Sequence, residues 1–126
     1  MNGPFLVLLM IFCHIAADYN LQGWLANAKQ KSWWEANAPD EMYIDDYLCA
    51  LLVHSFAWAF MVMLPIAYYM HFNVDGMFIG MLFANIIGHF FIDHMKANVK
   101  VINLWIDQAL HMVQLAITLY ICVMLR

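Results

Sequence analysis

Ionisable side chains recur one helical turn apart in three separate apolar stretches, and a fourth apolar stretch carries one histidine. The seven residues are His14 and Asp18, His89 and Asp93, Asp107 and His111, and the single His54. Residues four apart share a helix face, so each pair can direct two donor atoms at one point. Because imidazole and carboxylate together suit zinc, iron or manganese, the pattern predicts a metal site with these seven residues as ligands.

The number of these ligands indicates more than one ion. Seven ligands exceed the four that a tetrahedral zinc ion needs, so we expect two divalent ions (zinc, manganese or iron) that share a bridging aspartate. Helical di-iron sites are usually rich in glutamate, and none of the four stretches contains one. This difference favours hydrolytic over oxygen chemistry. Gln22 and Gln108 are expected to contact the ligands rather than the ions.

The composition is that of an integral membrane protein. Of the 126 residues, 66% are hydrophobic and 11% are charged, against about 25% charged residues in soluble domains. The net charge of −4 provides no basic surface for nucleic acid. The three cysteines have no CxxC spacing, so we expect neither a disulfide framework nor a thiolate metal site.

Four apolar segments are long enough to place the predicted ligands inside a bilayer. Each has roughly 20 residues or more, which as a helix crosses about 30 Å of hydrocarbon. We therefore predict an all-α fold, a four-helix transmembrane bundle of up-down topology in one domain, residues 1–126. The expected helices span about 4–25, 47–70, 74–98 and 101–125, with a loop at 27–46 that carries two adjacent tryptophans and two lysines.

The first segment also admits a second interpretation. Its uninterrupted apolar run, residues 5–13, has the length of a signal-peptide core. No basic residue precedes this run, however, and His14, Asp18 and Gln22 continue one polar face through the second half of the segment. We therefore expect a retained helix.

The seven predicted ligands lie at one depth in an antiparallel bundle. Each is about five to ten residues from the lysine-rich end of its own helix, which corresponds to roughly 7 to 15 Å. Helices that run in opposite directions have no reason to agree in this way by chance. Lys29, Lys31, Lys96 and Lys100 lie at this end and Arg126 at the other. The positive-inside rule then places the site near the cytoplasmic face and both termini on the non-cytoplasmic side.

The order of these motifs resembles a small bacterial and phage membrane-protein family catalogued as a domain of unknown function, family 3307. The family pattern is HxxxD[Y/F]xxQ, a lone His, HxxxDxxK and DQxxH. It is matched here by His14, Asp18, Tyr19 and Gln22, by His54, by His89, Asp93 and Lys96, and by Asp107, Gln108 and His111. The match spans nearly the whole chain. It implies a bacterial inner-membrane or phage protein, and it implies no particular activity.

These observations lead us to expect a metal-dependent hydrolase that acts on a lipid-borne or small phosphate or ester. The expected catalytic residues are Asp18, Asp93, Lys96 and Asp107. Lys96 and Lys29 would hold an anionic headgroup above the ions. A proton-relay or transport protein, a non-enzymatic membrane accessory protein and a purely structural polar core remain alternatives.

Overall fold

The computed structural model describes all 126 residues and contains helices and no strands. The four long helices are α1 (Gly3–Ile15), α4 (Asp46–Tyr69), α5 (Gly76–His94) and α6 (Leu104–Leu119). Three of them continue into π-helical segments at Ala16–Asn20, Met95–Val99 and Tyr120–Met124. The remaining elements are α2 (Leu25–Ala28), α3 (Lys31–Asn37) and a 3₁₀ turn (Glu41–Tyr43). The predicted all-α fold is confirmed.

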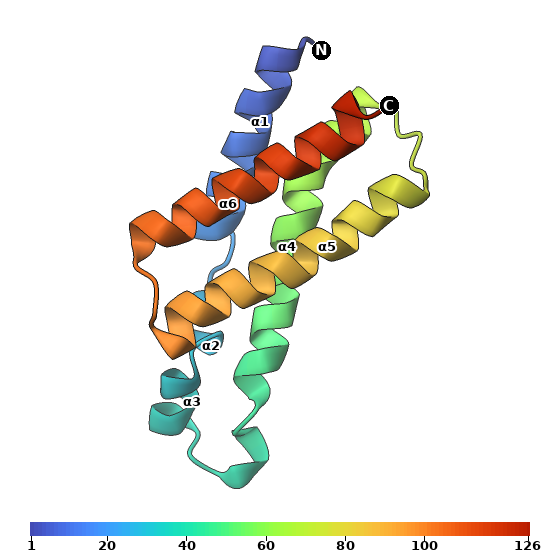
Figure 1. The fold of residues 1–126 in the computed structure, drawn as a ribbon. Coiled ribbons are helices and arrows are strands. Elements are labelled where there is room, and N and C mark those ends of the chain that lie inside the picture. Colours follow the sequence, from blue (N-terminus) through green and yellow to red (C-terminus); the bar gives the residue numbers. More distant parts are fainter.

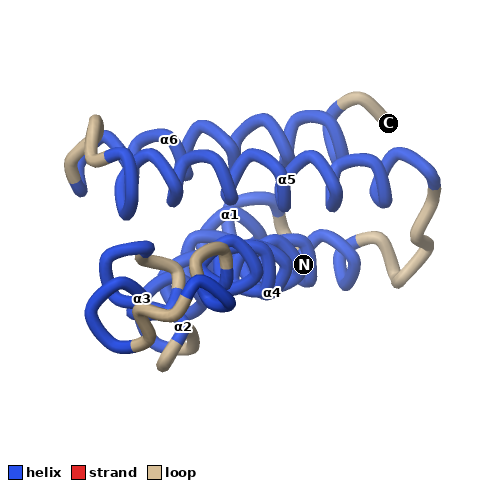
Figure 2. The backbone as a smooth tube through the Cα atoms, turned by 90° about the horizontal axis from the view of Figure 1, so that it is seen from below, coloured by secondary structure: helices blue, strands red, loops and turns tan.

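The long helices form two layers. Helices α1 and α4 make up one layer, and α5 and α6 lie side by side in a second layer that crosses the first obliquely (Figures 1 and 2). Both termini and the α4–α5 turn lie at one end of the molecule, whereas α2, α3 and the α5–α6 turn lie at the other (Figure 1). Each long helix, taken together with the π-helical segment or 3₁₀ turn next to it, is long and apolar enough to cross a membrane. The four candidate spans indicate a membrane protein.

The first long helix ends earlier than the sequence predicts. Its helical segment ends at Asn20 rather than near residue 25, and the backbone then turns through Gly23, which has φ of +52°. Only glycine adopts this left-handed conformation at little cost, so Gly23 allows the sharp redirection into α2. The predicted loop at 27–46 therefore contains α3 and the 3₁₀ turn, and α2 ends within it.

Polar side chains begin three of the long helices. The side chains of Asn2, Asp75 and Asn103 each accept a hydrogen bond from a backbone N–H in the first turn of α1, α5 and α6 respectively. These N–H groups have no partner within the helix, so the caps satisfy donors that would otherwise be unpaired.

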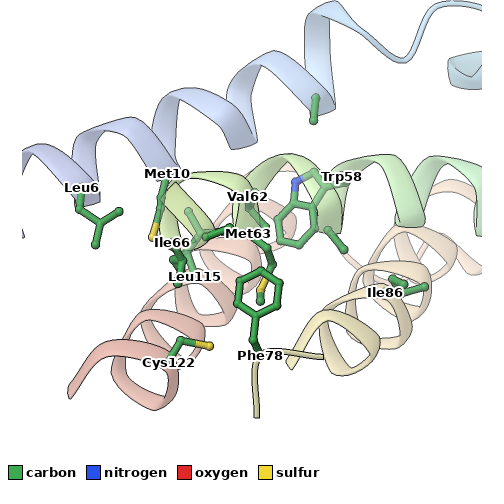
Figure 3. Close-up of a cluster of buried hydrophobic side chains, with 13 residues drawn as sticks. Leu6, Met10, Trp58, Val62, Met63, Ile66, Phe78, Ile86, Leu115 and Cys122 are labelled. Atoms are coloured by element: carbon green, nitrogen blue, oxygen red, sulfur yellow. The ribbon is translucent and has the colours of Figure 1, made fainter. Parts of the chain in front are cut away.

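The apolar core lies between the layers, and α4 supplies its centre. Trp58, Val62, Met63 and Ile66 of α4 are fully or almost fully buried. They pack with apolar residues of the other three long helices, namely Leu6, Met10, Phe78, Ile86, Leu115 and Cys122 (Figure 3). The outward faces also carry many exposed large apolar side chains. This distribution is what a bilayer, rather than water, would stabilise.

Candidate metal centre

Six of the seven predicted ligands converge where the layers meet, on the side of Trp58 nearer the lysine-rich end. They are Asp18 from the π-helical segment after α1, His54 from α4, His89 and Asp93 from α5, and Asp107 and His111 from α6. All six are buried, with exposed fractions of 6% or less. They form two groups that share Asp18: a group of four with His54, His89 and Asp93, and a group of three with Asp107 and His111. Within each group the possible ligand atoms lie within 4.8 Å of one another.

The group of four has the dimensions of a tetrahedral metal site. Four ligand atoms placed about 2.0 to 2.1 Å from a zinc ion lie roughly 3.3 to 3.4 Å from one another. Here His54 Nε2 lies 3.3 Å from Asp18 Oδ1, 3.2 Å from Asp93 Oδ2 and 3.1 Å from His89 Nε2. The corresponding distances from His89 Nε2 are 3.5 Å to Asp18 Oδ1 and 3.6 Å to Asp93 Oδ2. These separations are those of ligands around one ion.

Hydrogen bonding alone does not account for this arrangement. A neutral imidazole carries one N–H, so His54 Nε2 can donate to only one of the three atoms that surround it. Asp18 Oδ1 is buried and accepts no hydrogen bond. An unpaired carboxylate oxygen in an apolar interior costs free energy that a cation would offset. The group is therefore compatible with a metal ion.

The group of three presents unpartnered atoms as well. Asp107 Oδ1 and His111 Nε2 are buried without hydrogen-bond partners and lie 3.5 Å apart. His111 Nε2 also lies 3.4 Å from Asp93 Oδ1. Asp18 belongs to both groups, and Asp93 contacts both, so either carboxylate can bridge two neighbouring cation positions.

His14, the seventh predicted ligand, lies beside the cluster but belongs to neither group. Its ring centroid is 5.4 Å from that of His111. Its Nδ1 accepts a hydrogen bond of 2.8 Å from Trp58 Nε1, and its Nε2 lies 2.9 Å from Gln108 Oε1. Both ring nitrogens are thus engaged by protein groups.

Trp58 is a site residue that the sequence analysis missed. Its ring stacks on His89 at a centroid distance of 4.2 Å and lies 5.3 Å from His111. The Nδ1 atoms of His89 and His111 are buried without hydrogen-bond partners, so on that side of each ring stacking, of Trp58 on His89 and of His89 on His111, takes the place of a hydrogen bond. The sequence contains a pattern that predicts this contact, because Trp58 follows His54 by four residues and therefore shares its helix face.

Two lysines contact the carboxylates from the lysine-rich end. Lys29 Nζ lies 2.7 Å from Asp93 Oδ2, and this lysine side chain is 13% exposed. Lys96 Nζ lies 3.3 Å from Asp107 Oδ2, and its side chain is 37% exposed. Lys29 is thus committed to a buried ion pair, whereas Lys96 also faces the surroundings.

Asn98, a second residue that the sequence analysis missed, holds Lys29 in place. Its Oδ1 accepts a hydrogen bond of 2.7 Å from the backbone N–H of Lys31, and its Nδ2 donates one of 3.0 Å to the carbonyl of Lys29. Trp34 Nε1 donates to the carbonyl of the neighbouring Ala28 at 2.7 Å. The segment between α2 and α3 is therefore fixed over the group of four.

The fold and the cluster define an all-α membrane protein with a buried histidine–aspartate centre compatible with metal. The chain belongs to the family described as "Protein of unknown function (DUF3307)", whose model matches residues 5–126. No curated protein and no solved structure matched the chain. The resemblance inferred from the spaced motifs is confirmed at the level of the family.

Proposed function

We propose that this protein binds two divalent metal ions within the bilayer, near its cytoplasmic face, and hydrolyses a lipid-borne or small phosphate or ester. The observation that carries the proposal is the set of separations of 3.1 to 3.6 Å among the ligand atoms of Asp18, His54, His89 and Asp93. Histidine and aspartate favour zinc, manganese or iron over calcium or magnesium.

The two groups suit different roles. Four protein ligands complete a tetrahedral shell, as in closed sites, whereas three ligands leave a position open, as in catalytic sites. Asp18, Asp107 and His111 would therefore hold the ion that faces substrate. An ion with an open position supplies a nucleophile from water at neutral pH. The three aspartates would act mainly as ligands, and one of them, released from an ion, would accept the proton.

Lys96 is the group best placed to attract an anionic substrate. It lies at the same end as Lys29, Lys31 and Lys100, and its ammonium remains partly exposed beside Asp107. Lys29 is less suitable because its ammonium is held against Asp93 by a contact of 2.7 Å. The excess of lysines at this end favours its placement on the cytoplasmic side.

The test is elemental analysis of detergent-purified protein. We expect up to two equivalents of a transition metal in the wild-type chain and about one fewer in His89→Ala, which removes a ligand of the group of four only. His71→Asn is the matched control, because His71 is exposed, lies outside both groups and has φ of 53°, which asparagine tolerates. Sub-stoichiometric metal in the wild-type protein would overturn the proposal.

A proton relay is the second candidate, and one observation favours it. Beyond the histidines, the buried Asn85 and Thr118 and the partly buried Gln114 form a hydrogen-bonded chain between α5 and α6. This chain extends the polar interior away from the lysine-rich end. A relay predicts proton flux in liposomes containing metal-free protein, abolished in Asn85→Leu. Flux that requires bound metal, or no flux at all, would exclude it.

A further inference from the structure

We propose that His14 is a positioning residue: together with Trp58 it fixes the orientation of Gln108, which in turn holds Asp107, a ligand of the second ion, and Asp18, the ligand that both ions share. This inference rests on the proposed metal centre and assigns His14 a role other than the ligand role expected from its spacing. Trp58, His14 and Gln108 form a chain of hydrogen bonds whose directions are fixed by the groups that donate and accept.

The proton positions on His14 are determined by Trp58. An indole Nε1–H can only donate, so the contact of 2.8 Å requires His14 Nδ1 to be the acceptor. A neutral His14 then carries its proton on Nε2. That N–H donates to Gln108 Oε1 at 2.9 Å. Trp58 therefore selects the tautomer of His14, and His14 selects which end of the Gln108 amide faces it.

The orientation of Gln108 decides how the carboxylates are held. With its oxygen towards His14, the amide nitrogen donates to Asp18 Oδ2 at 3.2 Å and to Asp107 Oδ2 at 2.9 Å. The two N–H groups of the amide are thus divided between two carboxylates from different helices. A flipped amide would place its carbonyl oxygen against both carboxylates and lose both bonds, so the contact with His14 excludes the flipped state.

The consequence lies in the oxygens that Gln108 leaves unpaired. The Oδ2 atoms of Asp18 and Asp107 are engaged, whereas both Oδ1 atoms are buried without hydrogen-bond partners. Asp107 Oδ1 lies beside His111 Nε2 in the group of three, whereas Asp18 Oδ1 lies 3.3 Å from His54 Nε2 and 3.5 Å from His89 Nε2 in the group of four. Through Gln108, His14 therefore acts on both carboxylates of the group of three, and on the group of four only through the shared Asp18.

The experiment is a calorimetric titration of metal-free protein with Zn²⁺, combined with X-ray absorption of the zinc-loaded protein to count coordinated imidazoles. We expect two binding steps in the wild-type protein. In His14→Phe the second step should weaken by about 10- to 100-fold, the usual effect of losing a group that orients a ligand. The first step should weaken less, because Asp18 is the one ligand of the group of four that contacts Gln108. The average number of imidazoles on the zinc that remains should not fall.

Two further variants separate positioning from general damage to the fold. Gln108→Met removes the same hydrogen bonds without altering a histidine and should reproduce the weakened second step. His14→Gln keeps one acceptor and one donor and should restore part of the affinity. A first step weakened as much as the second in His14→Phe, a loss of coordinated imidazole, or two unchanged steps would each overturn the inference. A wild-type protein that binds no zinc would instead overturn the metal centre itself.

Discussion

The Nε2 atoms of His54 and His89 lie 3.1 Å apart, although α4 and α5 belong to different layers of the fold. Both nitrogens also face the same oxygens of Asp18 and Asp93. Polar atoms, and not apolar packing, thus join three of the four long helices at this point. Such a junction is stable only when its charges are compensated, so a bound ion would contribute directly to the stability of the fold.

Removal of metal should therefore destabilise the protein. A ligand present at about 1,000 times its dissociation constant stabilises the native state by about 4 kcal/mol. We expect chelation to lower the midpoint of thermal unfolding of the wild-type protein, and re-addition of metal to restore it. Intrinsic fluorescence in detergent measures this midpoint. His54→Ala should unfold at a lower temperature and respond less to chelator, whereas His71→Asn should behave as wild type. A midpoint insensitive to chelation would contradict this prediction.

Loss of the Lys29 ammonium should destabilise the protein even without metal. Lys29→Met would leave the carboxylate of Asp93, which is 3% exposed, without its contact of 2.7 Å. Removal of one partner from a buried ion pair costs about 3 to 5 kcal/mol, and the partial exposure of Lys29 places the effect near the lower value. The measurement is denaturant unfolding in detergent. Lys31→Met is the control, because the hydrogen bond from Lys31 to Asn98 comes from its backbone. Equal effects of the two substitutions would show that the ion pair is unimportant.

Lys96→Met should weaken the binding of an anionic headgroup with little effect on stability. A lysine near an anionic membrane surface contributes about 1 kcal/mol, or roughly fivefold in affinity. Titration with a short-chain phosphatidic acid in detergent would measure this change. Lys100→Asn is the control, because it removes a charge at the same end and asparagine tolerates the φ of 60° found there. A larger loss of affinity in Lys100→Asn than in Lys96→Met would show that the anion does not bind beside Asp107.

The convergence of six residues was predictable from the sequence because it depends only on spacing and depth. A spacing of four residues places His89 and Asp93 on one face, and the distance from the helix end places Asp107 and His111 beside them. The partners of each nitrogen were not predictable in this way. His14 lies at the right depth, yet its ring nitrogens contact Trp58 and Gln108, whereas Asp18, one turn further along the same helix, reaches both groups. Depth along an axis does not specify which neighbouring helix a side chain faces.

The last prediction concerns the segment that covers the centre. Asn98→Ala would remove the two hydrogen bonds that join Asn98 to this segment, one from the N–H of Lys31 and one to the carbonyl of Lys29, besides a contact of 3.3 Å with His94 Nδ1 on its own helix. The junction of α2 and α3 should therefore open more often. Each bond contributes about 1 kcal/mol, which together corresponds to a roughly 10- to 30-fold increase in the open population. Limited trypsin digestion should then cut after Lys29 or Lys31 at a correspondingly higher rate. Asn37→Ala is the control, because Asn37 bonds only to the carbonyl of Trp33 within α3. Bound metal should slow cleavage in Asn98→Ala, since Lys29 reaches the centre through Asp93, and cleavage equal to that of the control would contradict a covering role.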